Sequence, residues 1–200
     1  MAMTIKKGKT FRRVLRPTAP PYIYKAITAI ARSAPVQITA PTHGLVSGQY
    51  VAIVSAKGMT QINSALDAKG NPKASEYRKV TVVDTNIVTI DGLNAADFSA
   101  YTTGGYLQFF TPLDMAGCTA RRSIKNKIGG TELLSLTTEN NGIVIDNVAH
   151  TITETISATD TAALTWKTGV SDLELVVTLS GHVTELDPPS AVTVVDEVTT

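Results

Sequence analysis

The chain has 200 residues and a formal net charge of +1 at pH 7, with 43% apolar and only 18% charged residues, which suits a globular protein with one respectable core or two modest ones. The low charge and the many Thr, Val and Ile residues favour strands, because β-branched side chains suit a pleated, half-buried surface. The single cysteine, Cys118, excludes an internal disulfide framework, and no run of about 18 apolar residues could span a bilayer, so we expect a soluble protein without a membrane partner.

Residues 1–26 are predicted to form a basic, extended N-terminal arm. Every charged residue up to Arg32 is basic, whereas Lys167 is the only basic residue after Lys127. Prolines within the segment hold the backbone near polyproline geometry, and they interrupt any apolar run that would indicate a secretory signal. An extended segment can add a strand to another chain, so we expect the arm to bind a partner protein. The predicted partner-binding residues are Lys6, Lys7, Lys9, Phe11, Arg12, Arg13 and Arg16.

Two other interpretations of this segment stay open. It could be a first strand that packs on its own domain, or a solvated basic tail. Nucleic acid is a further possible partner, because clustered basic residues bind phosphates and Phe11 could stack on a base. The rest of the chain is acidic overall and would repel nucleic acid, so we expect the partner to be protein.

Short strands separated by turns are predicted over residues 27–110, which we take as the first domain. The strand-like runs are residues 36–39, 50–54, 79–84, 86–90 and 106–110. Residues 60–66 could form one helical turn with Thr60 as its N-cap.

Thr111 and Pro112 mark a boundary, and residues 111–200 are predicted to form a second domain. Seven short runs divided by turns have the spacing of a β-sandwich. One helical insertion is expected over residues 157–164, capped by Ser157 or Thr159. In the run 151–156, Glu154 shares a face with two isoleucines, so we expect that strand to lie near a domain edge. The predicted fold class is therefore all-β, with two small domains after the arm, the second of them an Ig-like β-sandwich.

No catalytic, metal or cofactor site is predicted. His43, His150 and His182 each stand alone, without the clustered spacing of zinc ligands, and His43 is expected to hydrogen-bond backbone in a turn. No Gly-x-Ser-x-Gly motif is present, and the Gly-Gly pairs do not open a helix that could hold a phosphate. Asp172 and Glu174 share a strand face, the arrangement of a solvated side. We therefore expect no enzyme activity and no cofactor.

The first domain resembles a small β-barrel module that is common in structural proteins of tailed bacteriophages. The resemblance lies in the motifs HGLVSGQYVAI at residues 43–53, GMTQIN at 58–63 and YTTGGY at 101–106. The same barrel is likened to a half-domain of ubiquitin-activating enzymes in fold but not in activity. The resemblance implies a barrel-like fold for residues 27–110.

The second domain resembles a β-sandwich of phage tail, baseplate and fibre-attachment proteins, and is similar to the virion-anchoring domain of some baseplate receptor-binding components. The matching segments are residues 112–124, 129–136, 142–146 and 166–175. The family pattern usually has Tyr where this chain has Cys118 and Ser171, which affects packing more than role. Trp166 is expected to fill the sandwich core with its indole N–H bonded to backbone.

Together the two resemblances imply a structural virion component of a tailed phage, assembled in the bacterial host cytoplasm. It would be an adaptor in the tail, baseplate or head-to-tail region that joins rings or attaches fibres. The expected partners are other virion structural proteins and further copies of the chain in a cyclic ring. The alternative is a receptor- or carbohydrate-binding module on the virion surface, which a cluster of exposed aromatic residues would favour, although only 6% of residues are aromatic. A cell-wall or polysaccharide hydrolase is a third hypothesis.

Overall fold

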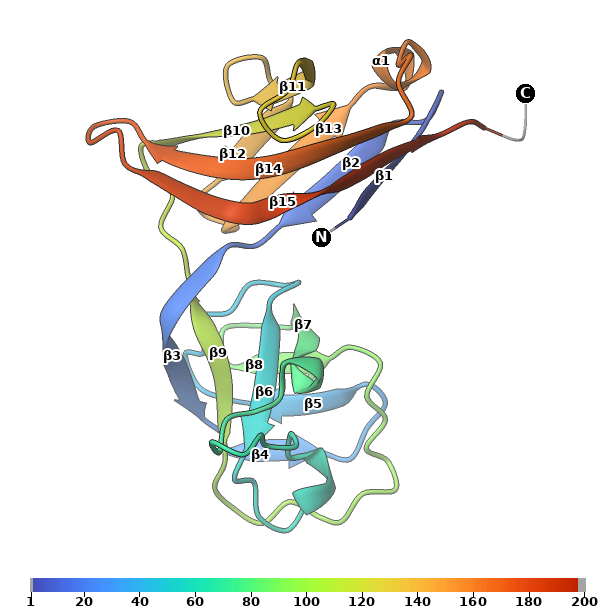
Figure 1. The fold of residues 1–200 in the computed structure, drawn as a ribbon. Coiled ribbons are helices and arrows are strands. Elements are labelled where there is room, and N and C mark those ends of the chain that lie inside the picture. The colour runs from blue at the N-terminus through green and yellow to red at the C-terminus, as the bar shows by residue number, and fades with distance from the viewer. Residues whose placement is uncertain (1, 198–200) are drawn as a thin grey trace. The chain divides into compact units, whose positions relative to one another are not determined.

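The computed structural model describes residues 2–197, and the chain is nearly all β, which confirms the all-β part of the predicted fold class (Figure 1). It divides into two compact units. The central unit is Thr18–Thr111, and the terminal unit combines Met1–Pro17 with Pro112–Thr200. The chain therefore passes between the units twice, and the second passage lies at the Thr111–Pro112 step that the sequence marks as a boundary.

The prediction of an extended arm over residues 1–26 is wrong for the part that the structure describes. Strands β1 (Met3–Lys6) and β2 (Phe11–Leu15) belong to the sheets of the terminal unit, whereas β3 (Thr18–Ala26) belongs to the central unit. The interpretation as a strand of the first domain therefore holds for β3 alone. The physical reason is the alternation of apolar residues in β1 and β2, whose inward side chains complete a core formed mostly by residues beyond Pro112.

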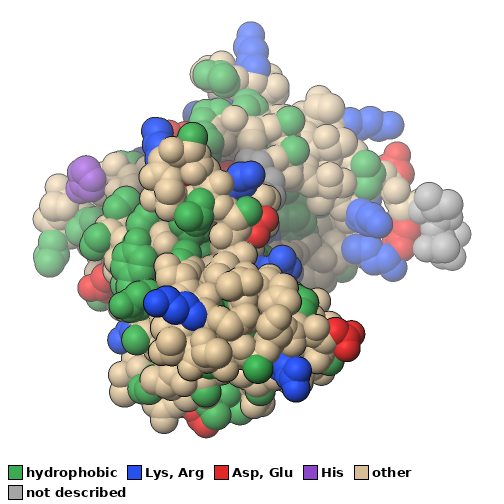
Figure 2. Space-filling model, turned by 90° about the horizontal axis from the view of Figure 1, so that it is seen from below, with side chains coloured by type: hydrophobic (Ala, Val, Ile, Leu, Met, Phe, Trp, Pro, Cys, Tyr) green, Lys and Arg blue, Asp and Glu red, His purple; other side chains and the backbone are tan. Residues whose placement is uncertain are grey.

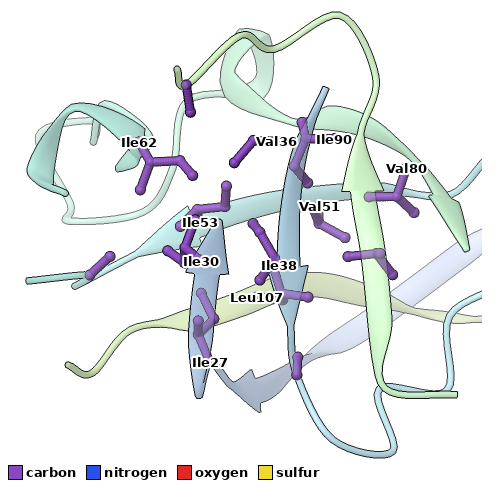
Figure 3. Close-up of a cluster of buried hydrophobic side chains, with 14 of the residues drawn as sticks. Ile27, Ile30, Val36, Ile38, Val51, Ile53, Ile62, Val80, Ile90 and Leu107 are labelled. Carbon is purple, nitrogen blue, oxygen red and sulfur yellow. The ribbon is translucent and has the colours of Figure 1, made fainter. Parts of the chain in front are cut away.

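The central unit is one curled seven-stranded sheet with the order β3-β9-β6-β7-β8-β5-β4. Its other strands and its two short 3-10 helices have the following bounds: β4 Ala29–Ala31, β5 Val36–Thr39, β6 Tyr50–Val54, η1 Thr60–Ile62, η2 Ala74–Glu76, β7 Arg78–Val82, β8 Ile87–Ile90 and β9 Tyr106–Pro112. Side chains on the concave face converge from different strands into one cluster, in which Ile38, Val51 and Leu107 are almost fully buried (Figure 3). This continuous inner core is what a barrel-like sheet requires.

The predicted backbone hydrogen bonding of His43 is confirmed, and Gly105 makes a close approach to Ala56. The buried His43 ring bonds backbone on both sides, with Nε2 2.9 Å from the carbonyl oxygen of Asp84 and Nδ1 accepting from the amide of Leu45 at 3.0 Å. Gly105 has φ +90°, and a Cβ there would lie 2.9 Å from the Cα of Ala56. The helical turn is shorter than predicted, and its N-cap is Met59 without a side-chain hydrogen bond.

The terminal unit is a β-sandwich, as predicted. A five-stranded sheet has the order β1-β15-β14-β10-β11, and a three-stranded sheet has the order β12-β13-β2. The inner faces of both sheets share one hydrophobic cluster. The strands not yet given are β10 Cys118–Lys125, β11 Glu132–Thr137, β12 Ile143–Asp146, β13 Thr151–Ile156, β14 Thr168–Val177 and β15 Val183–Val195, and helix α1 is Ala158–Ala162.

The two ends of the chain meet in the five-stranded sheet. Strand β1 pairs in parallel with the end of β15, with Met3 opposite Val192 and Lys6 opposite Val195. Figure 1 shows β1 and β2 in blue beside strands coloured yellow to red. Helix α1 begins after Ser157, whose hydroxyl accepts from the amide of Asp160 at 3.0 Å, which confirms the first predicted cap.

Two expectations about the sandwich are wrong. Strand β13, expected near a domain edge, is the central strand of its sheet, and its Glu154 is fully buried because an arginine within the core compensates its charge. Trp166 is half-buried against the core, but its indole N–H has no hydrogen-bond partner among the described residues.

Candidate functional site

The residues predicted to bind a partner are divided between the core and the surface of the terminal unit. Phe11 packs against the core, and Arg16 Nη1 donates to the carbonyl oxygen of Ala149 at 2.8 Å. Arg13 joins a buried ion-pair network. Lys6 and Arg12 are exposed.

The basic residues after β1 lie beside the acidic residues after β15. Lys9 Nζ is 2.6 Å from Glu197 Oε1, and Lys7 Nζ is 4.0 Å from Asp196 Oδ1. The parallel pairing of β1 with β15 causes this proximity, because both strands run in the same direction and end together. The charge asymmetry along the sequence is thus partly neutralised inside one chain. Exposed pairs of this kind contribute little stability, about 0–1 kcal/mol each.

Arg122 is the centre of the buried ion-pair network, which we define as Arg13, Arg122, Glu154 and Asp187. Its fully buried guanidinium donates from Nε to Glu154 Oε1 at 2.6 Å and from Nη2 to Asp187 Oδ2 at 3.0 Å. A third bond runs from Nη1 to Ser171 Oγ at 2.9 Å. Because Glu154 lies on the three-stranded sheet and Arg122 on the five-stranded sheet, the arginine joins the two layers of the sandwich.

Arg13 adds a second positive charge to the network. Its Nη1 donates to Asp187 Oδ2 at 2.9 Å and lies 4.0 Å from Glu154 Oε2. Burial alone would raise the pKa of Asp187, but hydrogen bonds from cationic groups, Arg122 and Arg13 among them, hold that pKa below its usual range. The carboxylate is therefore ionised at neutral pH, and two arginines face two carboxylates. This arrangement fixes β2 in the sandwich.

A second feature is the outward side of the three-stranded sheet, which we name the three-strand face and define by Arg12, Val14, Val144, Thr153 and Thr155. Val144 lies opposite Thr153, which lies opposite Val14, so the three form one cross-strand row. Both valines are exposed. Within residues 2–197, neither β12 nor β2 has a second strand neighbour. The face thus combines an exposed β-branched row with two open strand edges, a combination that suits pairing with another protein.

A third feature lies on the outward side of the sheet of the central unit, where five of the six tyrosines of the chain gather. Side chains alternate along a strand, so Tyr22 and Tyr24 of β3 share this side with Tyr106 and Phe110 of β9. Ring centroids are 4.4 Å apart for Tyr22 and Phe110 and 6.3 Å for Tyr24 and Tyr106. Figure 2 views the central unit from below and shows hydrophobic side chains, in green, gathered on its left side.

Tyr50 of β6 and Tyr77, which directly precedes β7, extend this group of aromatic side chains. The Tyr77 ring is stacked 5.9 Å from Phe110, and Tyr50 shares a strand face with the buried Ala52. The Gln108 side chain is buried on the same side and donates to the Tyr77 hydroxyl at 3.4 Å. Burial and the neighbouring Tyr22 hydroxyl raise the pKa of Tyr77, so it stays a neutral donor. We name the set Tyr22, Tyr24, Tyr50, Tyr77, Tyr106 and Phe110 the aromatic face.

Sequence reasoning missed the aromatic face because the aromatic content of the chain is low. The available signal was spacing: the pairs 22 and 24, and 106 and 110, are separated by even numbers of residues in strand-like runs. Even spacing places side chains on one side of a strand. The sequence does not show that β3 and β9 are neighbours, so it could not bring the two pairs together.

A polar hollow of about 370 Å³ lies over the outward side of β10, β11 and β14. Asp172 and Glu174 line it, which confirms that they share one strand face. Arg121 Nε is 2.6 Å from Glu174 Oε2, and Ser123 donates to Glu132 Oε2 at 2.6 Å, so much of its polar surface is satisfied internally. In the described part of the chain, no group of three or more His, Cys, Asp or Glu residues could hold a metal ion.

Comparisons with known proteins add no identity. Neither the comparison with protein-family models nor the search of curated proteins finds a match for this chain. Among the described residues, no helix has the length and apolar character needed to cross a membrane.

Proposed function

We propose that this chain is a structural component of a tailed-phage particle, an adaptor in the tail, baseplate or head-to-tail region that joins rings or attaches fibres. The resemblance of its motifs to phage structural modules supports the proposal, and so does the all-β architecture. The partners are other virion proteins and further copies of the chain, and the location is the virion.

The three-strand face is the observation that carries this proposal. It offers a partner backbone groups on the open edges of β2 and β12, together with an exposed row of β-branched side chains. Arg12 lies at its rim and can pair with a carboxylate of the partner. Each such contact is small, but copies in a ring add their contacts through effective concentration.

The experiment is incorporation into particles. Purified virions are analysed by mass spectrometry for the wild-type chain and for the double variant Val14→Asp with Val144→Asp. We expect the wild-type chain in the particles and strongly reduced incorporation of the variant, because two charges would lie on the contact row. The matched control is Leu179→Asp, which places a charge at a fully exposed loop position outside the three-strand face.

Absence of the wild-type chain from purified virions would overturn the proposal as a whole. Normal incorporation of a folded double variant would overturn only the role of the three-strand face. Circular dichroism and thermal unfolding of both variants establish that they are folded.

The alternative, a carbohydrate- or receptor-binding module, has one observation in its favour. Exposed aromatic residues do form a cluster, on the central unit.

A further inference from the structure

We infer that the aromatic face binds a neutral oligosaccharide, whose sugar rings contact Tyr24, Tyr50 and Tyr106. The inference rests on the second candidate function, to which it gives a site and a ligand class, and it is independent of the adaptor proposal. The three tyrosines are 53%, 57% and 45% exposed, although half-buried rings pack around them. Such residues are not needed for the core, which lies on the opposite side of the sheet.

The chemistry of the aromatic face matches a sugar. A pyranose ring has apolar C–H groups on its faces and hydroxyl groups around its rim. A tyrosine has an apolar ring and a hydroxyl that donates and accepts hydrogen bonds. The rings of Tyr24 and Tyr106 lie on neighbouring strands with centroids 6.3 Å apart and planes at 88° to each other, so they form a corner in which the face of one ring can stack on a sugar while the other ring contacts the rim of that sugar.

The charge of the aromatic face indicates a neutral ligand. Its six members are five tyrosines and one phenylalanine, and none of them is a Lys, Arg, Asp or Glu residue. The charged side chain opposite Tyr50 is Lys79, whose Nζ lies 3.9 Å from Asp91 Oδ2. An acidic or basic ligand would therefore gain little from the face, whereas a neutral one would leave no charge unpaired.

The area of the face separates a sugar from a protein partner. A tyrosine side chain presents on the order of 200 Å² when free, so at the observed exposures these three rings offer roughly 300 Å². A stable protein interface covers roughly 800 Å² on each partner. The exposed aromatic area is of the size that a short oligosaccharide covers, and it is less than half of what a whole stable protein interface covers on one partner.

The rings are also held before any ligand arrives. The Tyr24 ring has Tyr22 at 6.4 Å and Tyr106 at 6.3 Å between centroids, Tyr22 in turn lies 4.4 Å from Phe110, and all these rings lie on strands. Little side-chain freedom is lost on binding, which favours affinity for a weakly interacting ligand.

The test is calorimetric and NMR titration of the full chain with cellohexaose, maltohexaose and chitohexaose as separate probes. We expect at least one probe to bind with a Kd of about 1 mM or lower and to shift the tyrosine ring resonances. Tyr24→Ala and Tyr106→Ala should each weaken that binding roughly fivefold or more, whereas Tyr106→Trp should retain it, because a larger ring still stacks.

Val83→Ala is the matched control, since Val83 is an equally exposed apolar side chain of the central unit outside the aromatic face. It should leave binding unchanged. The inference is overturned if no probe binds, or if binding survives both alanine variants. It is also overturned if sedimentation shows that the wild-type chain self-associates through this face and that the alanine variants abolish the association. Particle incorporation of the same alanine variants separates this result from the adaptor proposal, which predicts no change.

Discussion

Replacing Arg122 with methionine should destabilise the terminal unit more than almost any other single change. The guanidinium is completely buried and makes three hydrogen bonds, two of them to carboxylates. Methionine fills much of the same volume but leaves Glu154 without its closest cation. Removing one partner of a buried ion pair costs about 3–5 kcal/mol, because the other charge stays buried.

Because Arg13 is a second cation in the network, we expect the loss of stability in Arg122→Met to lie toward the lower end of the range of about 3–5 kcal/mol. Arg13 Nη1 lies 2.9 Å from Asp187 Oδ2 in the wild-type chain, so we expect that carboxylate to keep a cation, whereas Glu154 Oε2 has Arg13 only at 4.0 Å. We therefore expect a loss of about 3 kcal/mol in the free energy of unfolding. A domain is stable by only about 5–15 kcal/mol, so the loss is large.

The assay is urea unfolding followed by tryptophan fluorescence. Trp166 is the only tryptophan and lies against the core of the terminal unit, so its emission reports that unit selectively. The matched control is Arg121→Met on the same strand, which removes an ion pair with Glu174 whose arginine side chain is 57% exposed. The control should cost at most about 1 kcal/mol.

A second variant tests the mechanism. Adding Glu154→Leu to Arg122→Met removes the orphaned carboxylate, and buried ion pairs can often be replaced by apolar residues without loss. The double variant should therefore be more stable than Arg122→Met alone. Equal losses for the substitutions at positions 121 and 122, or further destabilisation by the second change, would refute the reasoning.

Three further predictions concern pH, the N-terminal segment and one glycine. The pKa of Asp187 is lowered in the folded chain, so the stability that its ionised carboxylate contributes is fully present above the ordinary aspartate pKa of about 3.9 and is lost as pH falls through the lower folded value. Melting temperatures measured at decreasing pH should show this loss. The variant Asp187→Asn should make the melting temperature depend less on pH in this range. Deleting residues 1–16 removes β1 and β2 and exposes the core of the terminal unit, in which each buried apolar side chain contributes about 1.5–3 kcal/mol of stability. Trp166 fluorescence should therefore show that the terminal unit is unfolded. Limited proteolysis should leave residues 18–111 intact. Gly105→Ala should lower the melting temperature of the central unit, with a loss of about 1–3 kcal/mol in the free energy of unfolding, because Gly105 has a positive φ and the added Cβ would meet Ala56. Gly70→Ala is the control, since Gly70 also has a positive φ but has open space around it. The difference between the two losses measures the steric contribution at Gly105.

Local features were predictable from the sequence because their causes are local. The strands at residues 36–39 and 50–54 have the predicted bounds, since alternating or continuous apolar runs between turns determine them. The cap at Ser157 depends on Asp160, three positions away, and the Nδ1 hydrogen bond of His43 depends on Leu45, two positions away. The second bond of His43, to Asp84, spans 41 residues and was not specified by the sequence.

Features that depend on distant pairing were not predictable. Glu154 lies between two isoleucines on one strand face, and its compensating cation, Arg122, is on another sheet. A single sequence does not show that pairing, so the acid suggested a strand near a domain edge, whereas the structure has the central strand of a sheet with Glu154 buried. The aromatic face has the same origin, because it needs the neighbouring positions of β3 and β9.

The charge asymmetry of the chain shows how a long-range pairing changes the meaning of a local pattern. A run of basic residues at one end and of acids at the other favours an external partner when the two ends are considered separately. The parallel pairing of β1 with β15 brings Lys9 to Glu197, and the sandwich core brings Arg13 to Asp187, so the partner of much of the basic segment is the other end of the same chain. Arg12 differs because strand alternation turns it outward, onto the three-strand face. Contact with another protein through that face therefore requires β2 to be fixed in the sheet by the inward Arg13, which makes the buried ion-pair network a precondition of the proposed adaptor surface.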